Sequence, residues 1–118
     1  AILFKGNEQG ESSMGDLGIK VLTFPLQVYI DEVNKIPENN DVISMTKDLL
    51  HRAYQRIGAS EEDVMNGVKS YFAARKILER ERGDSITLAG CVDLVKYRPC
   101  IAWATLSDEG IPGICEGI

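Results

Sequence analysis

Ser85-Ile-Thr-Leu-Ala89 and Ile111-Pro-Gly-Ile-Cys115 are two short, mainly apolar runs, each bounded by turn-forming residues. Between them, Pro99 stands before the apolar segment Cys100-Ile-Ala-Trp-Ala-Thr-Leu106. A helix tolerates proline in its first turn, where the missing N–H has no partner to lose. The order therefore predicts a strand, a helix and a second strand. Units of this kind place their strands parallel in one sheet and cover the sheet with helices.

The first part of the chain adds two further predicted strands. Ile2–Phe4 is a short apolar run, and Ile19–Phe24 is β-branched and apolar and is ended by Pro25. Between them, the glycine-bearing segment Asn7–Gly18 is predicted to be a loop. Because strands alternate with helices, we expect an α/β fold with a small, mostly parallel sheet flanked by helices, of the Rossmann or flavodoxin-like type. Residues 1–118 are expected to form a single α/β domain.

Three helices are predicted between the second and third strands. The first spans Leu26–Ile36. The second is expected to begin with Asn40 as its cap and to stop at Gly58, because both residue types favour those positions. The third opens with Ser60-Glu-Glu-Asp63, the spacing of a capping box, and continues to about Arg82.

Charge and hydropathy exclude several classes of partner. The net charge is -5, and Lys and Arg are scattered among acidic residues. Nucleic acids and anionic membranes attract basic surfaces, so neither is expected as a partner. The sequence has no run of about 18 apolar residues, so no transmembrane helix is predicted.

The cysteines do not form a recognisable framework. Cys91, Cys100 and Cys115 are odd in number, and their spacing fits no zinc motif. Each falls in or beside an apolar segment. Free cysteine behaves as a small hydrophobic residue, so we expect buried thiols in a reducing cytoplasm.

Two acidic residues follow predicted strands at the end where α/β folds place their sites. Asp93 comes after the third strand and Glu116 after the fourth. Carboxylates on neighbouring strand ends could bind a hard divalent cation or exchange protons. The plainer alternatives remain open: Glu116 as a loop carboxylate in water, and Asp93 as a turn residue at a strand exit.

The other polar residues receive plainer interpretations. His51 is the one histidine and lies within a predicted helix, where we expect a structural or exposed role. Asp108 and Glu109 are predicted to form a solvated turn at a helix end. The glycine-bearing segment 6–18 lacks every phosphate-loop pattern, and its acidic residues would repel phosphate.

The segment from Asp84 to Glu116 resembles the L-fucose isomerase-like family. The matching stretches are Gly83–Thr87, Pro99–Ala102, Leu106–Pro112 and Cys115–Gly117. The combination Asp-Glu-Gly-Ile-Pro plus Cys-Glu-Gly is fairly specific, and the rest is generic α/β sequence. The family pattern continues with an aspartate where this chain has Ile118.

The resemblance implies aldose–ketose isomerisation of a sugar, assisted by Mn²⁺ or a similar divalent cation. In the family, the glutamate of the Cys-Glu-Gly motif is a metal ligand and part of the proton-transfer machinery, which maps onto Glu116. The family's other ligands, an aspartate and a histidine, come later in the sequence. We therefore expect these 118 residues to be a fragment of the second domain of a larger cytoplasmic isomerase. The fragment itself is expected to be inactive and to bind no cation tightly.

An alternative function is a non-catalytic, flavodoxin-like module that binds a ligand or another protein. In that case the glycines of segment 6–18 would shape a ligand crevice and Glu116 would be incidental. Dependence on a divalent cation separates the two hypotheses. For the isomerase, the expected partners are a sugar substrate and, through sites shared between subunits, other copies of the protein.

Overall fold

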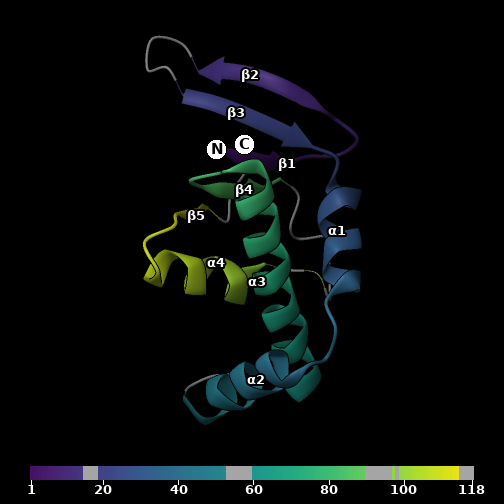
Figure 1. Ribbon diagram of the computed structural model, residues 1–118, viewed down its shortest axis with the longest axis vertical. Coiled ribbons are helices and arrows are strands. Elements are labelled where there is room, and N and C mark those ends of the chain that lie inside the picture. The colour runs from purple at the N-terminus through teal and green to yellow at the C-terminus, as the bar shows by residue number, and fades with distance from the viewer. Residues whose placement is uncertain (15–18, 53–59, 90–96, 98, 115–118) are drawn as a thin grey trace.

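A computed structural model describes residues 1–14, 19–52, 60–89, 97 and 99–114. That part of the chain forms an α/β structure with one sheet and four helices (Figure 1). In chain order the elements are β1 (Ile2–Phe4), β2 (Gly10–Met14), β3 (Ile19–Phe24), α1 (Leu26–Lys35), α2 (Asn40–Arg52), α3 (Glu61–Glu81), β4 (Ile86–Leu88), α4 (Cys100–Asp108) and β5 (Gly113–Ile114). The α/β class and the strand–helix–strand order of its last three elements are confirmed.

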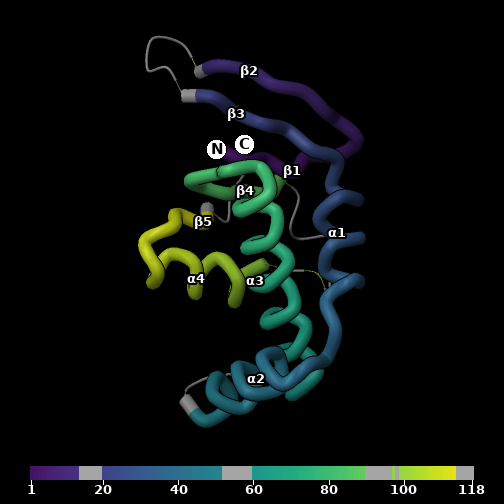
Figure 2. Tube along the Cα trace, in the orientation of Figure 1, coloured from purple at the N-terminus to yellow at the C-terminus, as the bar shows by residue number. Residues whose placement is uncertain are grey.

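The sheet is mostly parallel, as predicted. Its strand order is β2-β3-β1-β4-β5. The first strand therefore lies between two strands that are distant from it in the sequence (Figure 2). β1 pairs in parallel with β3 and with β4, and β4 pairs in parallel with β5. Opposite Phe4 stand Phe24 on one side and Leu88 on the other.

The prediction of a loop over Asn7–Gly18 is wrong for Gly10–Met14, which forms the antiparallel edge strand β2. Its sequence, Gly-Glu-Ser-Ser-Met, has little strand propensity. The strand forms because β3 offers a free row of backbone donors and acceptors on its outer side, with Ser12 opposite Val21. Lys20 and Glu11 add a cross-strand ion pair at 3.0 Å. A polar, charged strand is suited to the exposed edge of a sheet.

The core lies on one face of the sheet. In β1 and β4 the outer residues are buried and the middle residue is half-buried, so Ile2, Phe4, Ile86 and Leu88 point to the same side. Helices α1, α3 and α4 pack against that side and against one another (Figure 1). The aromatic rings show the contact: the Phe4 ring centroid lies 5.4 Å from that of Tyr29 in α1. Burial of this face is the main stabilising term of the fold.

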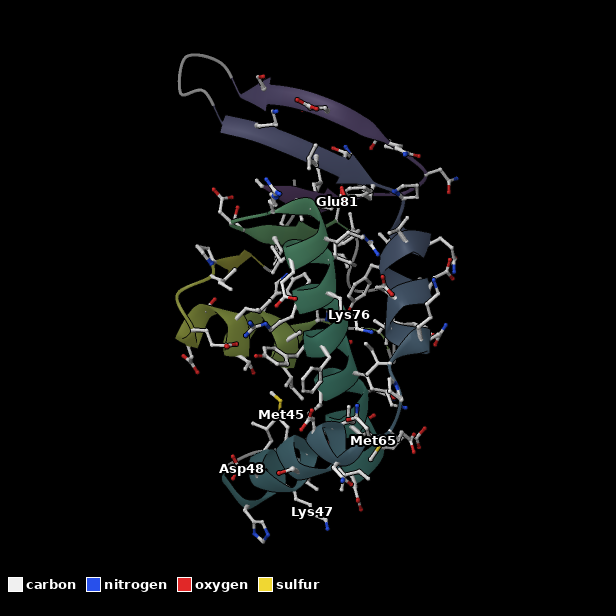
Figure 3. The ribbon with its side chains drawn as sticks, in the orientation of Figure 1. Met45, Lys47, Asp48, Met65, Lys76 and Glu81 are labelled. Atoms are coloured by element: carbon white, nitrogen blue, oxygen red, sulfur yellow. The ribbon has the colours of Figure 1, made fainter. Side chains whose placement is uncertain are left out.

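Helix α2 extends away from the sheet and packs across the first half of α3 (Figure 3). Its buried residues, Val42, Thr46 and Leu49, recur at helical spacing. Met45 points from α2 toward the body of the molecule, whereas Lys47 lies on the exposed side. Among the helices described, none has the length and apolar character that crossing a bilayer requires.

The helix starts agree with the predictions except at α2. The capping box is confirmed: the Ser60 hydroxyl accepts from the Asp63 N–H at 3.1 Å, and the Asp63 carboxylate accepts from the Ser60 N–H at 3.3 Å. The cap of α2 is not Asn40, which is the first helical residue. Asn39 takes that role, because its Oδ1 accepts from the Val42 N–H at 3.0 Å. The predicted stop at Gly58 lies outside the described residues.

Candidate functional site

The carboxyl ends of β1, β3, β4 and β5 meet along one edge of the sheet, because these strands are parallel. The Ala89 N–H donates to the Phe4 carbonyl at 2.9 Å, so the chain leaves β4 beside the end of β1. In the described part of β5, Ile114 pairs with Thr87 of β4. The carboxyl ends of β4 and β5 therefore lie next to each other, at the end of the strands where α/β sites form.

The two predicted acidic site residues, Asp93 and Glu116, both lie outside the described residues. The last described residues before them, Ala89 and Ile114, belong to or directly follow neighbouring strands. Of the features on which the predicted site depends, the structure therefore shows one, the parallel pairing of β4 with β5. A divalent-cation role for Glu116 stays a prediction.

A divalent cation such as Mn²⁺ is held by several ligands. Hard cations such as Mn²⁺ favour carboxylate and carbonyl oxygens, so the side chain of Glu116 is suitable in type. Within the ranges that the structure describes, no group of three or more His, Cys, Asp or Glu side chains is arranged to hold a metal ion. The described residues by themselves therefore form no site with three such ligands.

A hollow of about 160 Å³ lies beside the same edge, where β1 leads into β2. Its acidic side chains already have partners: Lys5 Nζ lies 3.5 Å from Glu8, and Lys20 Nζ lies 3.0 Å from Glu11. The sequence that lines it has no phosphate-loop motif. The hollow is lined by Glu8, Gln9, Gly10, Glu11, Ser12 and Thr23.

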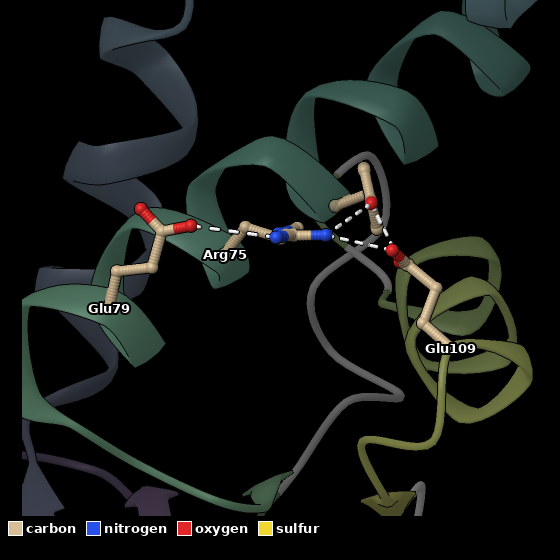
Figure 4. A network of polar contacts seen from close by, with 4 residues as sticks. Arg75, Glu79 and Glu109 are labelled. Carbon is tan, nitrogen blue, oxygen red and sulfur yellow. Dashed lines mark hydrogen bonds and ion pairs between the residues drawn. The ribbon is translucent and has the colours of Figure 1, made fainter.

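A second polar cluster joins α3 to the end of α4 (Figure 4). The Tyr71 hydroxyl donates to one oxygen of Glu109 at 2.6 Å, and Arg75 Nη1 donates to the other at 2.7 Å. Arg75 Nη1 also lies 3.1 Å from the Tyr71 hydroxyl, and its other terminal nitrogen lies 3.5 Å from Glu79. Glu109 is therefore not the freely solvated turn residue that the sequence predicted, whereas Asp108 is exposed as expected.

The electrostatics of this cluster favour a structural role over acid–base chemistry. Burial raises the pKa of the Tyr71 hydroxyl, and its hydrogen bond to the Glu109 carboxylate raises it further. A tyrosine with a raised pKa stays protonated near neutral pH and cannot act as a base there. The sequence contained half of the signal, because Tyr71 and Arg75 are four residues apart on one helix and so share a face. Their partner, Glu109, comes from another helix and could be found only in the tertiary structure.

His51 is exposed, as the sequence predicted. Cys100 is also exposed, which contradicts the expectation of buried thiols. It is the first residue of α4, whose buried face is formed by Ala102, Trp103 and Leu106. Cys91 and Cys115 lie outside the described residues.

Comparison of the chain with protein-family models, with curated proteins and with solved structures finds no match. The resemblance to the L-fucose isomerase-like family consequently depends on the motifs quoted above.

Proposed function

We propose that this chain supplies one domain of a metal-dependent aldose–ketose isomerase of the L-fucose isomerase-like type, active in the carbohydrate metabolism of the cytoplasm. The observation that carries the proposal is the parallel pairing of β4 with β5. Because of this pairing, the segment with Asp93 and the Cys-Glu-Gly segment with Glu116 both follow carboxyl ends at one edge of the sheet. That is the edge at which α/β enzymes assemble their sites.

The proposed chemistry needs a positioned carboxylate at this edge. Isomerisation moves a proton between C1 and C2 of the sugar, so one group must accept the proton and return it to the neighbouring carbon. Glu116 is the residue proposed to hold that proton and to contribute an oxygen ligand. When bound, a divalent cation would polarise the sugar oxygens. In the family that the chain resembles, the remaining ligands follow this motif in the sequence, so the proposal places them in another part of the same enzyme.

The test is made on the protein expressed from its complete natural gene, whose intact mass is measured first. A mass several times that of 118 residues is expected. Mn²⁺ affinity and ketose formation from a panel of aldoses are then compared between the wild type and Glu116→Gln. We expect turnover to fall by about 10²-fold or more, the usual contribution of a general base. Glu38→Gln, which removes an exposed carboxylate paired with Lys69, serves as the control and should change neither quantity.

Three results would count against the proposal. Unchanged Mn²⁺ affinity and turnover in Glu116→Gln would remove the residue from the site and favour the non-catalytic module. Ketose formation by the 118-residue chain itself would show that no further ligands are needed. If the natural gene product had the same mass as this chain, the resemblance to the isomerases would indicate common ancestry and not a shared activity.

A further inference from the structure

We propose that the outer edge of β2 is a dimerisation surface and that its partner is the β2 strand of a second copy of this chain. The two strands pair antiparallel about a two-fold axis at Ser12, so that two sheets become one. The inference concerns an edge of the sheet and does not depend on the proposed isomerase chemistry.

β2 is the outermost strand of the sheet (Figure 2). Within the part of the chain that the structure describes, it pairs with β3 alone, through five consecutive residue pairs without a bulge. Natural edge strands are commonly protected from further pairing by proline, by a bulge or by charge. Gly10–Met14 has neither proline nor bulge, and its one charge, on Glu11, is paired with Lys20 of β3. Its outer side can therefore accept another strand.

The pairing of β3 shows which backbone groups of β2 point outward. The Leu22 N–H donates at 2.8 Å to the carbonyl of the residue before β1, so Leu22 directs its backbone groups toward β1. The next residue, Val21, therefore directs its groups toward β2, where it stands opposite Ser12. Because the direction alternates along a strand, Glu11 and Ser13 direct their N–H and C=O groups away from the sheet.

These outward groups select one register for the second strand. Glu11 and Ser13 both find partners within the opposing β2 in one arrangement only, in which Glu11 of each copy stands opposite Ser13 of the other. Each such pair can exchange both of its N–H···O bonds, and Ser12 then stands opposite Ser12 on the two-fold axis. The same register avoids placing one Glu11 directly opposite the other, where like charges would be destabilising.

The charged side chains at this edge fit that register. Lys20 stands opposite Ser13 in the sheet and lies 3.0 Å from Glu11 of its own chain. In the dimer, Ser13 lies between Lys20 and Glu11 of the other copy, whose Cα atoms are two strand spacings or about 10 Å apart. Long side chains can meet across the small serine, so each Glu11 is flanked by a lysine from both copies. The charges at the junction cancel, whereas the whole chain carries -5.

The contact is small and polar, so the association is expected to be weak and reversible. A single strand edge buries less surface than a permanent interface requires. The polar side chains also let the same edge tolerate water when the copies separate. The experiments therefore measure pairing at β2 itself, on the protein from its complete natural gene, and their readouts do not depend on other contacts between copies.

Cysteine substitution at the two-fold axis tests the register. Ser12 and its symmetry mate form a non-hydrogen-bonded pair with Cα atoms about 4.5 Å apart, which is within the range of a disulfide. Ser13 and its mate are diagonal neighbours about 7–8 Å apart, which is too far. After mild oxidation, Ser12→Cys should form a disulfide between the two residues 12, identified by peptide mass. The matched control Ser13→Cys should form none between the two residues 13.

Hydrogen exchange measures the association without a cross-link. Exchange at the Glu11 and Ser13 amides should slow by about tenfold or more as protein concentration rises from about 1 µM to about 1 mM, the range in which weak complexes form. Ser13→Pro removes a donor that β3 does not use, so it should retain the fold and abolish the protection of the Glu11 amide. Ser13→Ala keeps the N–H and should behave as the wild type does.

Each contrary result has a distinct meaning. Absence of the disulfide in Ser12→Cys, or equal disulfide formation in Ser13→Cys, would overturn the register. Fast exchange at both amides at every concentration would overturn the dimer. Full protection at every concentration, without the disulfide in Ser12→Cys, would show that another part of the natural protein covers β2, and would overturn the second copy as its partner. The isomerase proposal is decided separately, by Glu116→Gln.

Discussion

Gly113 in β5 lies so close to Trp103 in α4 that a Cβ atom on the glycine would come within 2.8 Å of the Trp103 Cα and 2.7 Å of its Cβ. The indole of Trp103 is buried, with 1% of its surface exposed. The contact is therefore made with backbone and core atoms that cannot move aside. Absence of a side chain at position 113 lets the strand and the helix pack in direct contact.

The substitution Gly113→Ala should consequently destabilise the protein. Overpacking of a closely packed contact costs about 1–3 kcal/mol, and the free energy of unfolding from urea denaturation should fall by that amount. Pro112→Ala, at the exposed neighbouring position, is the control and should stay within about 0.5 kcal/mol of the wild type. Equal stability of Gly113→Ala and the wild type would mean that β5 can move away from α4.

The two adjacent asparagines at the start of α2 should differ in their contribution to stability. Asn39→Ala removes the side chain that accepts from the Val42 N–H, and loss of such a cap costs about 1 kcal/mol. Asn40→Ala replaces the first helical residue with a better helix former and should be close to neutral. Thermal or urea unfolding of the two variants measures the difference. If Asn40→Ala lost more stability than Asn39→Ala, the cap would be Asn40, as the sequence predicted.

Tyr29 should make the protein less stable at alkaline pH. Burial raises the pKa of its hydroxyl, which also donates to the Tyr97 carbonyl at 2.7 Å. Below about pH 10 the residue is protonated in both the folded and the unfolded state, and its contribution is complete. At higher pH the unfolded tyrosine ionises first, so stability falls as pH rises toward the folded-state pKa.

The comparison is between the wild type and Tyr29→Phe, with urea unfolding at about pH 8 and pH 11. The stability advantage of the wild type should shrink at the higher pH, because phenylalanine has no proton to lose. Val33→Ala, a core variant of the same helix without a titratable group, should show the same deficit at both values. A constant difference between the wild type and Tyr29→Phe would show that Tyr29 ionises as readily in the fold as in water.

The two faces of the sheet should respond differently to truncation. Leu88 is fully buried on the helix-covered face, and Leu88→Ala should lower the free energy of unfolding by about 2–5 kcal/mol. Leu3 points to the other face and is half-buried. Because the Leu3 side chain buries less surface than that of Leu88, Leu3→Ala should lower the free energy of unfolding by less than about 2 kcal/mol. Equal losses would mean that both faces are covered to the same extent.

Much of the fold could be predicted from local patterns. The apolar runs at Ile2–Phe4 and Ile19–Phe24 are strands, and the Ser60 capping box opens α3 as expected. Such signals depend on residues close together in the sequence, so they survive without knowledge of the tertiary structure. The candidate site could not be compared in the same way, because Asp93 and Glu116 fall outside the described residues. The role of Glu116 stays a prediction.

The amino-acid sequence by itself determined the α/β class, a mostly parallel sheet and most helix starts, because these follow from periodicity, capping and the alternation of strands with helices along the chain. The tertiary structure decided the rest. Gly10–Met14 became a strand because β3 had an open edge, and Glu109 found partners because α4 packs beside Tyr71 and Arg75. These outcomes depend on groups that are distant in the sequence, whose proximity only the packed fold creates.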